Sequence, residues 1–260
     1  MRIWIVQIGE MISGVDEGVR GYRYTSLARN LAARGHEVVR WSSTFEHVGK
    51  KFRRDTSATI EIAPRLQVRL LHALPAYRRN ISVARWRQQR HVTGLFLAEA
   101  GAWPKPDLIV AGVPVPELAE AAVKQAQVLG IPVVIDAQDQ WPDIYLNAAP
   151  APLRPLARLA LAGEIRRSRR LFAGATAITA VSQTYLDWAT ERAGRATGPG
   201  DRVFPLGMAA SSAGQATPAE LALVREKYGI SPEAMVALFV GTFGASYDIE
   251  AMVACARLLD

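Results

Sequence analysis

The feature that most constrains the fold is a regular alternation of apolar runs with helical segments. The runs 2–9 (RIWIVQIG), 36–43 (HEVVRWSS) and 107–114 (DLIVAGVP) are apolar over most of their length. Strands of this kind are typical of parallel sheets whose two faces are both covered by helices. Residues 22–35 place their apolar side chains on one helical face and end at Gly35. The chain is therefore predicted to open with a β-α-β unit.

The alternation continues further along the chain. Residues 116–130 predict a helix, with Pro116 in its first turn and Gly130 after its end. Further strands are expected over 131–137, 175–182 and 202–205. We therefore expect an α/β fold with a doubly wound, Rossmann-like parallel sheet.

Length and composition divide the chain into two parts. Its 260 residues exceed the usual size of one domain, about 100–150 residues. We expect residues 1–207 to form the first domain. Residues 208–260 are expected to hold a linker, 208–216, and the incomplete start of a second α/β domain.

The second part carries three local signals. Thr217 and Glu220 have the spacing of a helix capping box, residues 235–244 (MVALFVGTFG) predict a strand with a glycine turn, and residues 249–259 predict a helix. A single β-α unit lacks sheet neighbours. We therefore expect this part to dock loosely after about residue 208. If the 260 residues are the whole polypeptide, we expect no independent activity of the chain.

Charge and cysteine content bound the environment and the partners. The net charge is +7, and residues 206–260 alone carry −3, so the first part holds +10. Such a field suggests a phosphate-bearing ligand, an anionic membrane or a nucleic acid. The single cysteine, Cys255, excludes an intramolecular disulfide. A reducing cytoplasm fits best, and a signal peptide or membrane span is not indicated.

Arginines concentrate in two segments, 76–100 and 153–172, where they are mixed with apolar side chains. Basic amphipathic helices can lie on an anionic bilayer. An ordinary solvated helix face gives the same pattern, so both interpretations remain open. Nucleic-acid binding has no support beyond charge, because no helix-turn-helix, RRM-like or OB-like pattern is present, and we expect no nucleic-acid partner.

Glycines follow the first run at positions 9, 14, 18 and 21. Their spacing differs from the dinucleotide-binding GxGxxG. Glycines let the backbone approach a ligand closely, and the helix N-terminus near residue 22 would offer N–H groups to it. A flexible connector remains the alternative interpretation.

The stretch 134–143 (VIDAQDQWPD) carries Asp136, Asp139 and Asp143 at the end of a strand. Open α/β sheets bind ligands beyond the carboxyl ends of their strands. A carboxylate there can accept hydrogen bonds from sugar hydroxyls or take a proton. Asp139 is the best placed of the three, although an aspartate that caps the next turn would look the same.

The histidines, at 36, 47, 72 and 91, show no metal-ligand spacing, and GxSxG, P-loop and HExxH patterns are missing. The sequence therefore predicts no metal site and gives no support to triad chemistry.

Together these motifs resemble a known family. The chain contains, in this order, LARNLAARGHEVVRWSS, PDLIVAGVP, IDAQDQWPD, ATAITAVSQTYLDWA, RVFPLG and ALFVGTFG. This succession of motifs resembles the family 4 retaining glycosyltransferases of the GT-B fold. The bacterial branch that builds polysaccharides and lipid-linked oligosaccharides is the most similar. The resemblance covers the N-terminal domain and only the opening of the second domain.

The resemblance implies roles for particular residues. Asp139 is the catalytic candidate, and the acceptor side would be contacted by Gly14, Gly18, Gly21, Gln138 and Trp141. Gly241, Thr242 and Gly244 would approach the diphosphate of the donor.

The sequence departs from the family at three places. Gln138 stands where many relatives have histidine and cannot act as a base, which leaves Asp139 or a donor phosphate oxygen. Leu206 replaces the asparagine common in the hinge turn. The paired-glutamate donor motif and the basic pair that binds the diphosphate are missing from the sequence.

The resemblance implies a retaining, metal-independent hexosyl- or glycosyltransferase. It would transfer a sugar from a nucleotide-sugar, with no other cofactor, to a polysaccharide or lipid-linked acceptor. The expected location is the cytoplasm, at the inner face of the plasma membrane, with the arginine-rich helices on anionic lipid. The alternative is a non-catalytic half domain that binds an acceptor or a partner subunit.

Overall fold

The computed structural model describes residues 1–16, 18–19, 21–207, 216–241, 243 and 247–258. The chain divides into two compact units, Met1–Ala209 and Ala210–Asp260. None of the helices in these described ranges is long and apolar enough to cross a membrane.

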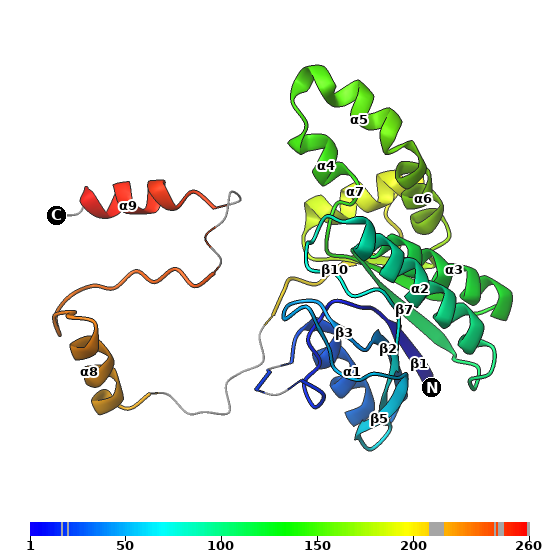
Figure 1. Cartoon of the computed structure of the whole chain (residues 1–260), viewed down its shortest axis with the longest axis horizontal. Coiled ribbons are helices and arrows are strands. Elements are labelled where there is room, and N and C mark those ends of the chain that lie inside the picture. The colour runs from blue at the N-terminus through cyan, green and yellow to red at the C-terminus, as the bar shows by residue number, and fades with distance from the viewer. Residues whose placement is uncertain (17, 20, 208–215, 242, 244–246, 259–260) are drawn as a thin grey trace. The chain divides into compact units, whose positions relative to one another are not determined.

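The first unit is built on one large sheet (Figure 1). Its strands, in the part of the chain described, are β1 (Arg2–Val6), β2 (Glu37–Ser43), β5 (Ala58–Ala63), β6 (Leu66–Leu71), β7 (Leu108–Val113), β8 (Val133–Ala137), β9 (Ala177–Ala180) and β10 (Arg202–Val203). Their order across the sheet is β10-β9-β8-β7-β1-β2-β6-β5, and all pairs are parallel except the edge pair β5–β6. A small hairpin, β3 (Phe45–Glu46) and β4 (Lys51–Phe52), follows β2.

Helices cover both faces of this sheet. The helices are α1 (Arg23–Ala33), α2 (Val83–Ala100), α3 (Pro116–Leu129), α4 (Asp143–Ala148), the short 3-10 helix η1 (Ala151–Leu153), α5 (Arg154–Ala160), α6 (Ala162–Ala173) and α7 (Gln183–Ala193). Tyr24 and Ala28 of α1 pack on one face with Ile5 of β1. Phe96 of α2 and Phe172 of α6 belong to the core on the opposite face. The expected doubly wound α/β fold is confirmed.

An aromatic cluster fixes α2 against the central strands. Trp4 of β1 and Trp41 of β2 meet edge to face with ring centroids 5.1 Å apart, and Trp41 meets Phe96 in the same way at 5.1 Å. All three side chains are buried. Edge-to-face pairs add about 0.5–1.5 kcal/mol each beyond the burial of area, so α2 has a well-defined position above β1 and β2.

The strand order creates a switch point between β1 and β7. From β1 the chain first builds β2, then β5 at the edge and β6 between β2 and β5, and afterwards it returns to the other side of β1 and builds β7 to β10. Loops at the carboxyl ends of β1 and β7 therefore turn in opposite directions. Open α/β sheets have their ligand crevice at this place.

The hairpin β5–β6 was not anticipated from the sequence. β6 alternates buried and exposed residues, as in LQVRLL, and extends the sheet in parallel beside β2. β5 precedes β6 in the chain, pairs with it in the antiparallel direction at the edge of the sheet, and is joined to it by a turn in which Arg65 has a positive φ of 65°. Alternation over six residues gives a weaker signal than the apolar runs of the central strands.

The second unit contains two helices among its described residues, α8 (Pro218–Lys227) and α9 (Ile249–Arg257). The capping box is confirmed, because the Thr217 side chain accepts from the Glu220 N–H and the Glu220 carboxylate accepts from the Thr217 N–H. The expected strand over 235–244 does not form in the described residues of that range. A strand needs a neighbour for its backbone hydrogen bonds, and none is present in the described part of this unit.

Candidate functional site

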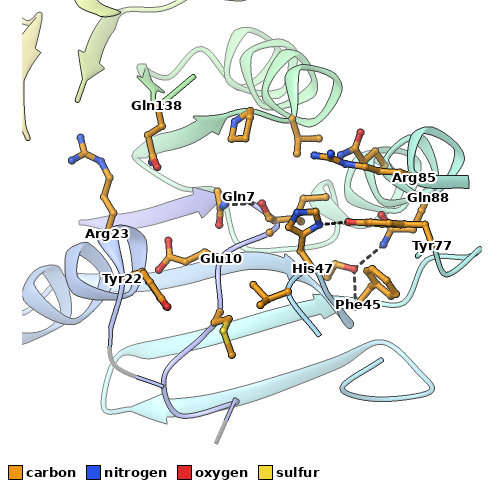
Figure 2. Close-up of a pocket in the computed structure, with 18 of the residues that line it drawn as sticks. Gln7, Glu10, Tyr22, Arg23, Phe45, His47, Tyr77, Arg85, Gln88 and Gln138 are labelled. Atoms are coloured by element: carbon orange, nitrogen blue, oxygen red, sulfur yellow. Dashed lines mark hydrogen bonds between the residues drawn. The ribbon is translucent and has the colours of Figure 1, made fainter. Parts of the chain in front are cut away.

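A cavity of about 700 Å³ opens at the switch point of the sheet. Gln7 after β1, Ser43 at the end of β2, Val115 after β7 and Gln138 after β8 all line it. In Figure 2, Arg23, Tyr22 and Glu10 lie at one end, Arg85, Tyr77 and Gln88 lie at the other, and Gln7 and His47 lie between them. The cavity therefore stands where the topology predicts a ligand.

The side chain of Glu10, which lies in the loop after β1, caps the N-terminus of α1. Its carboxylate accepts hydrogen bonds from the backbone N–H groups of Tyr24 and Thr25, both at 3.0 Å. It also lies 3.6 Å from the guanidinium of the buried Arg40. A carboxylate at a helix N-terminus satisfies the free N–H groups and the helix dipole. The expectation that these N–H groups would serve a ligand is therefore wrong for the two that Glu10 holds.

Asp136 is the buried centre of a hydrogen-bond network at the end of β8. Arg23 binds its two carboxylate oxygens at 2.8 Å each. Tyr24 Oη donates at 2.8 Å, Thr179 Oγ1 at 2.7 Å and Gln138 Nε2 at 2.8 Å. Burial by itself would raise the pKa of Asp136, but Arg23 and these hydrogen bonds outweigh burial and lower it. Asp136 is therefore a fixed anion that holds α1, β8 and β9 together.

Asp143 is also committed to structure. It accepts a hydrogen bond from Trp188 Nε1 at 2.7 Å and forms an ion pair with Arg192, both on α7. It lies in the first turn of α4, where a carboxylate also favours the helix.

Asp139 differs from both neighbours in the stretch 134–143. In the described ranges its side chain has no ion pair and no hydrogen bond to another side chain. Burial raises the pKa of Asp139, opposed in part by the Gln140 N–H and the charge of Arg85. It directly follows Gln138, which lines the cavity. Asp139 is thus a partly buried carboxylate free to exchange a proton or to accept hydrogen bonds.

The opposite end of the cavity is basic. His47 Nδ1 lies 2.6 Å from Tyr77 Oη and 3.2 Å from Lys50 Nζ. Burial, with the charges of Lys50 and Arg85, lowers the pKa of His47 to about 4, so the ring is uncharged at neutral pH. Arg85 donates from Nη1 to the Asn80 carbonyl at 2.7 Å. Within the described residues it forms no ion pair, which leaves a positive charge at the cavity wall.

The residues implied on the acceptor side lie in different places. Gly21 and Gln138 line the cavity. Gly14 is packed against β5, where a Cβ would lie 3.0 Å from the Ile62 side chain, and Gly18 has open space around it. Trp141 packs edge to face on Tyr145 at 4.7 Å, and its Nε1 donates to Glu164 at 3.5 Å. Gly14, Gly18 and Trp141 do not belong to the cavity wall.

Of the residues implied at the donor, only Gly241 can be described. It is exposed, and a Cβ there would lie 2.9 Å from the Phe239 ring. Thr242 and Gly244 lie outside the described residues.

Several cavity residues were missed from the sequence, namely Arg23, His47, Tyr77, Arg85 and Gln88. Arg23 has no local signal, because its partner Asp136 lies 113 positions away. Arg85 was counted only within an arginine-rich segment. A better signal was Ser82, whose side chain caps α2 by accepting from the Arg85 N–H at 3.1 Å. That cap places Arg85 in the first turn, three residues before the buried Gln88.

No group of three or more His, Cys, Asp and Glu side chains in the described ranges could hold a metal ion. The metal-independent reaction stays a prediction.

Comparison with protein families gives a match to the glycosyl transferase 4-like domain over residues 21–207. No curated protein matches the chain.

Comparison with solved structures gives low similarities. Anabaena HepE in complex with UDP has 12% identity and a TM-score of 0.45, with 88% of this chain and 50% of that chain covered. A UGT transferase from Siraitia grosvenorii in complex with UDP has 10% identity and a TM-score of 0.40, with 82% and 52% covered. A UDP-glucosyltransferase from Polygonum tinctorium has 12% identity and a TM-score of 0.36, with 81% and 53% covered. The chain spans about half the length of these proteins.

Proposed function

The chain belongs to the glycosyl transferase 4-like domain family, and from this premise we propose that its first unit is the acceptor-binding domain of a retaining, metal-independent GT-B glycosyltransferase. The observation that carries the proposal is the cavity at the switch point, together with Asp139, which directly follows the lining residue Gln138 and has no ion pair in the described chain. Asp136 and Asp143 are held by arginines, so Asp139 is the carboxylate there that can meet a sugar hydroxyl.

The proposed donor is a nucleotide-sugar, because sugar transfer needs an activated sugar with a good leaving group. No further cofactor is proposed. Gly241, Thr242 and Gly244 remain the proposed contacts to the donor diphosphate, since glycines allow close approach of the backbone to phosphates. We also propose that the sugar transferred from the donor is a hexose.

The chemistry of the cavity favours an acceptor with an anionic group joined to an apolar part. Arg85 supplies a positive charge without a carboxylate partner among the described residues. Phe45, Val48 and Val115 line the same cavity. A lipid-linked sugar phosphate satisfies both features, because its phosphate can pair with Arg85 while its lipid contacts apolar side chains. We therefore favour a lipid-linked acceptor over a free polysaccharide.

The setting proposed is bacterial polysaccharide or lipid-linked oligosaccharide assembly. A lipid-linked acceptor is confined to a bilayer, and nucleotide-sugars are made in the cytoplasm. The protein is therefore proposed to act in the cytoplasm at the inner face of the plasma membrane.

The test is release of nucleoside diphosphate from a set of nucleotide-sugars in the presence of a short-chain lipid phosphate sugar. The chain is assayed alone and mixed with a separately purified donor-binding domain of a family member. Turnover in either assay supports the enzyme. Acceptor binding by calorimetry without turnover in both assays would favour the alternative, a non-catalytic half domain that binds an acceptor or a partner.

Arg85→Gln tests the acceptor assignment separately. We expect it to weaken acceptor binding about tenfold, because it removes one charge-assisted pair of about 1.5 kcal/mol. Arg87→Gln, an exposed neighbour on the same helix that does not line the cavity, is the matched control. Equal affinities of the two variants would argue against a phosphate contact at Arg85.

A further inference from the structure

A second arginine-rich region lies away from the cavity of the proposed acceptor. We define the helical arm as residues 143–173, from α4 to α6. Figure 1 shows α4 and α5 projecting beyond the sheet of the first unit. α5 has no buried residue, although its sequence RPLARLA is half apolar. A helix this exposed gains little from packing against its own unit.

The arm exposes a row of large apolar side chains. Leu153, Leu156 and Leu159 are 53%, 65% and 74% exposed, and Ile144 of α4 is 51% exposed. Leu153 ends η1 at the N-cap of α5, and the spacing of three residues places Leu156 and Leu159 of α5 on the same side of the helix as Leu153. Arg154 and Arg158 are spaced by four and fall on the opposite side. Exposed apolar rows of this kind mark contact surfaces, and the arrangement is that of an interfacial amphipathic helix.

A cavity of about 410 Å³ lies between α4, α5, α6 and α7, on the side of α5 that carries Arg154 and Arg158. Four arginines line it, Arg154, Arg158, Arg169 and Arg192, against one aspartate, Asp143.

The charge of this cavity is not balanced. Asp143 is paired with Arg192, and Arg154 donates from Nε to the Ala149 carbonyl at 3.3 Å. Arg158 and Arg169 have neither a hydrogen bond nor an ion pair from their side chains within the described residues. Arginines that converge without counter-ions repel one another, and a phosphate that binds them bidentately removes the repulsion.

We propose that the helical arm docks on an anionic lipid bilayer, with a lipid phosphate in the arginine-lined cavity and the leucines of α5 in the boundary between headgroups and acyl chains. The leucine row supplies the apolar contact and the arginine side of α5 stays at the level of the headgroups, as expected for a helix lying in the interface. The charge selects anionic lipid over zwitterionic lipid. This docking rests on the proposed function for its setting at the membrane and names the surface that would make the contact. Vesicle binding is measured without sugar transfer, so the two proposals can fail separately.

The test is co-sedimentation of the purified 260-residue protein with vesicles of phosphatidylcholine alone and of phosphatidylcholine with 30% phosphatidylglycerol (about one anionic lipid in three). We expect binding to the anionic vesicles only, weakened at least tenfold by about 0.5 M NaCl because salt screens exposed charges. Equal binding to both vesicle types, or no binding to either, would overturn the proposal.

Two double variants with the same change of net charge locate the surface. Arg158→Gln with Arg169→Gln removes the two unpaired arginines of the cavity, and we expect about a 25-fold loss of binding, roughly fivefold for each arginine. Arg87→Gln with Arg90→Gln on α2 is the control, since both side chains are exposed and lie outside the arm. Equal losses in the two double variants would mean that net charge alone drives binding, and the arm would not be the site.

Leu156→Ser with Leu159→Ser tests the apolar contact at constant charge. Both side chains are exposed, so the melting temperature should not change while vesicle binding falls at least tenfold.

Two other occupants are distinguished by further measurements. Calorimetric binding of inorganic phosphate without vesicle binding would assign the cavity to a soluble anion. Dimerisation in sedimentation velocity that the leucine variant abolishes, without vesicle binding, would assign the leucine row to a second copy of the chain. Either result overturns the proposal.

Discussion

Asp139 is the residue on which the proposed chemistry depends, because its neighbours Asp136 and Asp143 are held by Arg23 and Arg192. Asp139→Asn in the active protein or mixture should lower kcat at least 100-fold, since a proton acceptor contributes about 10²–10⁴-fold. The acceptor affinity should stay within about threefold. The measurement is steady-state turnover with acceptor binding by calorimetry.

The pH dependence of kcat is a second test of the role of Asp139. Because burial raises the pKa of Asp139, the ionised base should disappear at a higher pH than for an ordinary carboxyl group, whose pKa is about 3.9. kcat should therefore fall as the pH drops through that raised value. A raised pKa also means that the ionised form is disfavoured in the folded protein. Asp139→Asn should then not lower the melting temperature at pH 7, and a clear decrease would point to a structural role.

Arg23 and Asp136 form a buried ion pair at the site, with side chains 17% and 3% exposed. Arg23→Gln should destabilise the protein by about 3–5 kcal/mol, because it leaves the Asp136 charge buried without its partner. Arg23→Gln combined with Asp136→Asn should recover part of that loss, since no charge is left unpaired. Urea unfolding monitored by fluorescence measures both. A loss below about 1 kcal/mol for the single variant would mean that the remaining hydrogen bonds are enough for Asp136.

The lowered pKa of Asp136 determines how its contribution to the stability of the fold changes with pH. Its contribution to stability is fully present above the ordinary carboxyl pKa of about 3.9 and is lost as the pH falls through the lower folded value. The free energy of unfolding of the Asp136→Asn variant should therefore depend less steeply on pH in that acidic range than that of the unmodified protein.

These residues show which parts of the site can be predicted from sequence. Gln138 directly follows a recognisable strand, and strand ends bind ligands, so its place in the cavity wall could be predicted. The catalytic role of its neighbour Asp139 stays a prediction. The three carboxylates of 134–143 could not be ranked fully, because their partners Arg23 and Arg192 come from distant segments. A carboxylate is free or paired only in three dimensions, so a sequence pattern cannot separate the two cases.

At the scale of elements, α2 shows how a cap positions cavity residues. Ser82→Ala should cost about 1 kcal/mol, because the Arg85 N–H loses its acceptor at the helix start. The first turn of α2 carries Arg85 at the cavity wall, so acceptor affinity should fall as well. Ser82→Asp keeps an acceptor at the cap and serves as the control. Urea unfolding and calorimetry report the two effects, and unchanged stability in Ser82→Ala would mean that the cap contributes nothing.

Elements were predicted well where local signals are strong and poorly where they depend on neighbours. The helix over 116–130 is confirmed, with Pro116 at its start and Gly130 in the left-handed conformation after its end. The edge pair β5–β6 depends on pairing with β2, which no local pattern reveals. The apolar run 235–244 has strand-like composition, yet its described residues form no strand. Strand formation depends on a partner as much as on propensity.

At the scale of the whole molecule, the core belongs to the first unit. All buried apolar side chains of the described chain lie between Ile3 and Ala189. A fragment of residues 1–207 should therefore melt within about 2 °C of the full chain, because a change of 1 kcal/mol would shift the melting temperature of a domain of this size by about 2–4 °C. Differential scanning calorimetry of both proteins measures this. A fragment that melts much lower would show that the second unit stabilises the first.

Arg23 connects the cavity to the segment through which the chain leaves the first unit. The guanidinium that neutralises Asp136 also donates to the carbonyl of Phe204 at 2.7 Å, and the next residues, Leu206 and Gly207, line the cavity. The segment through which the chain leaves the first unit is therefore part of the cavity wall. Any molecule that prefers one position of this segment must bind more tightly when the segment is held there, and the same free energy acts in reverse on the segment. For such a molecule, occupancy of the cavity and the conformation of residues 204–207 are thermodynamically linked.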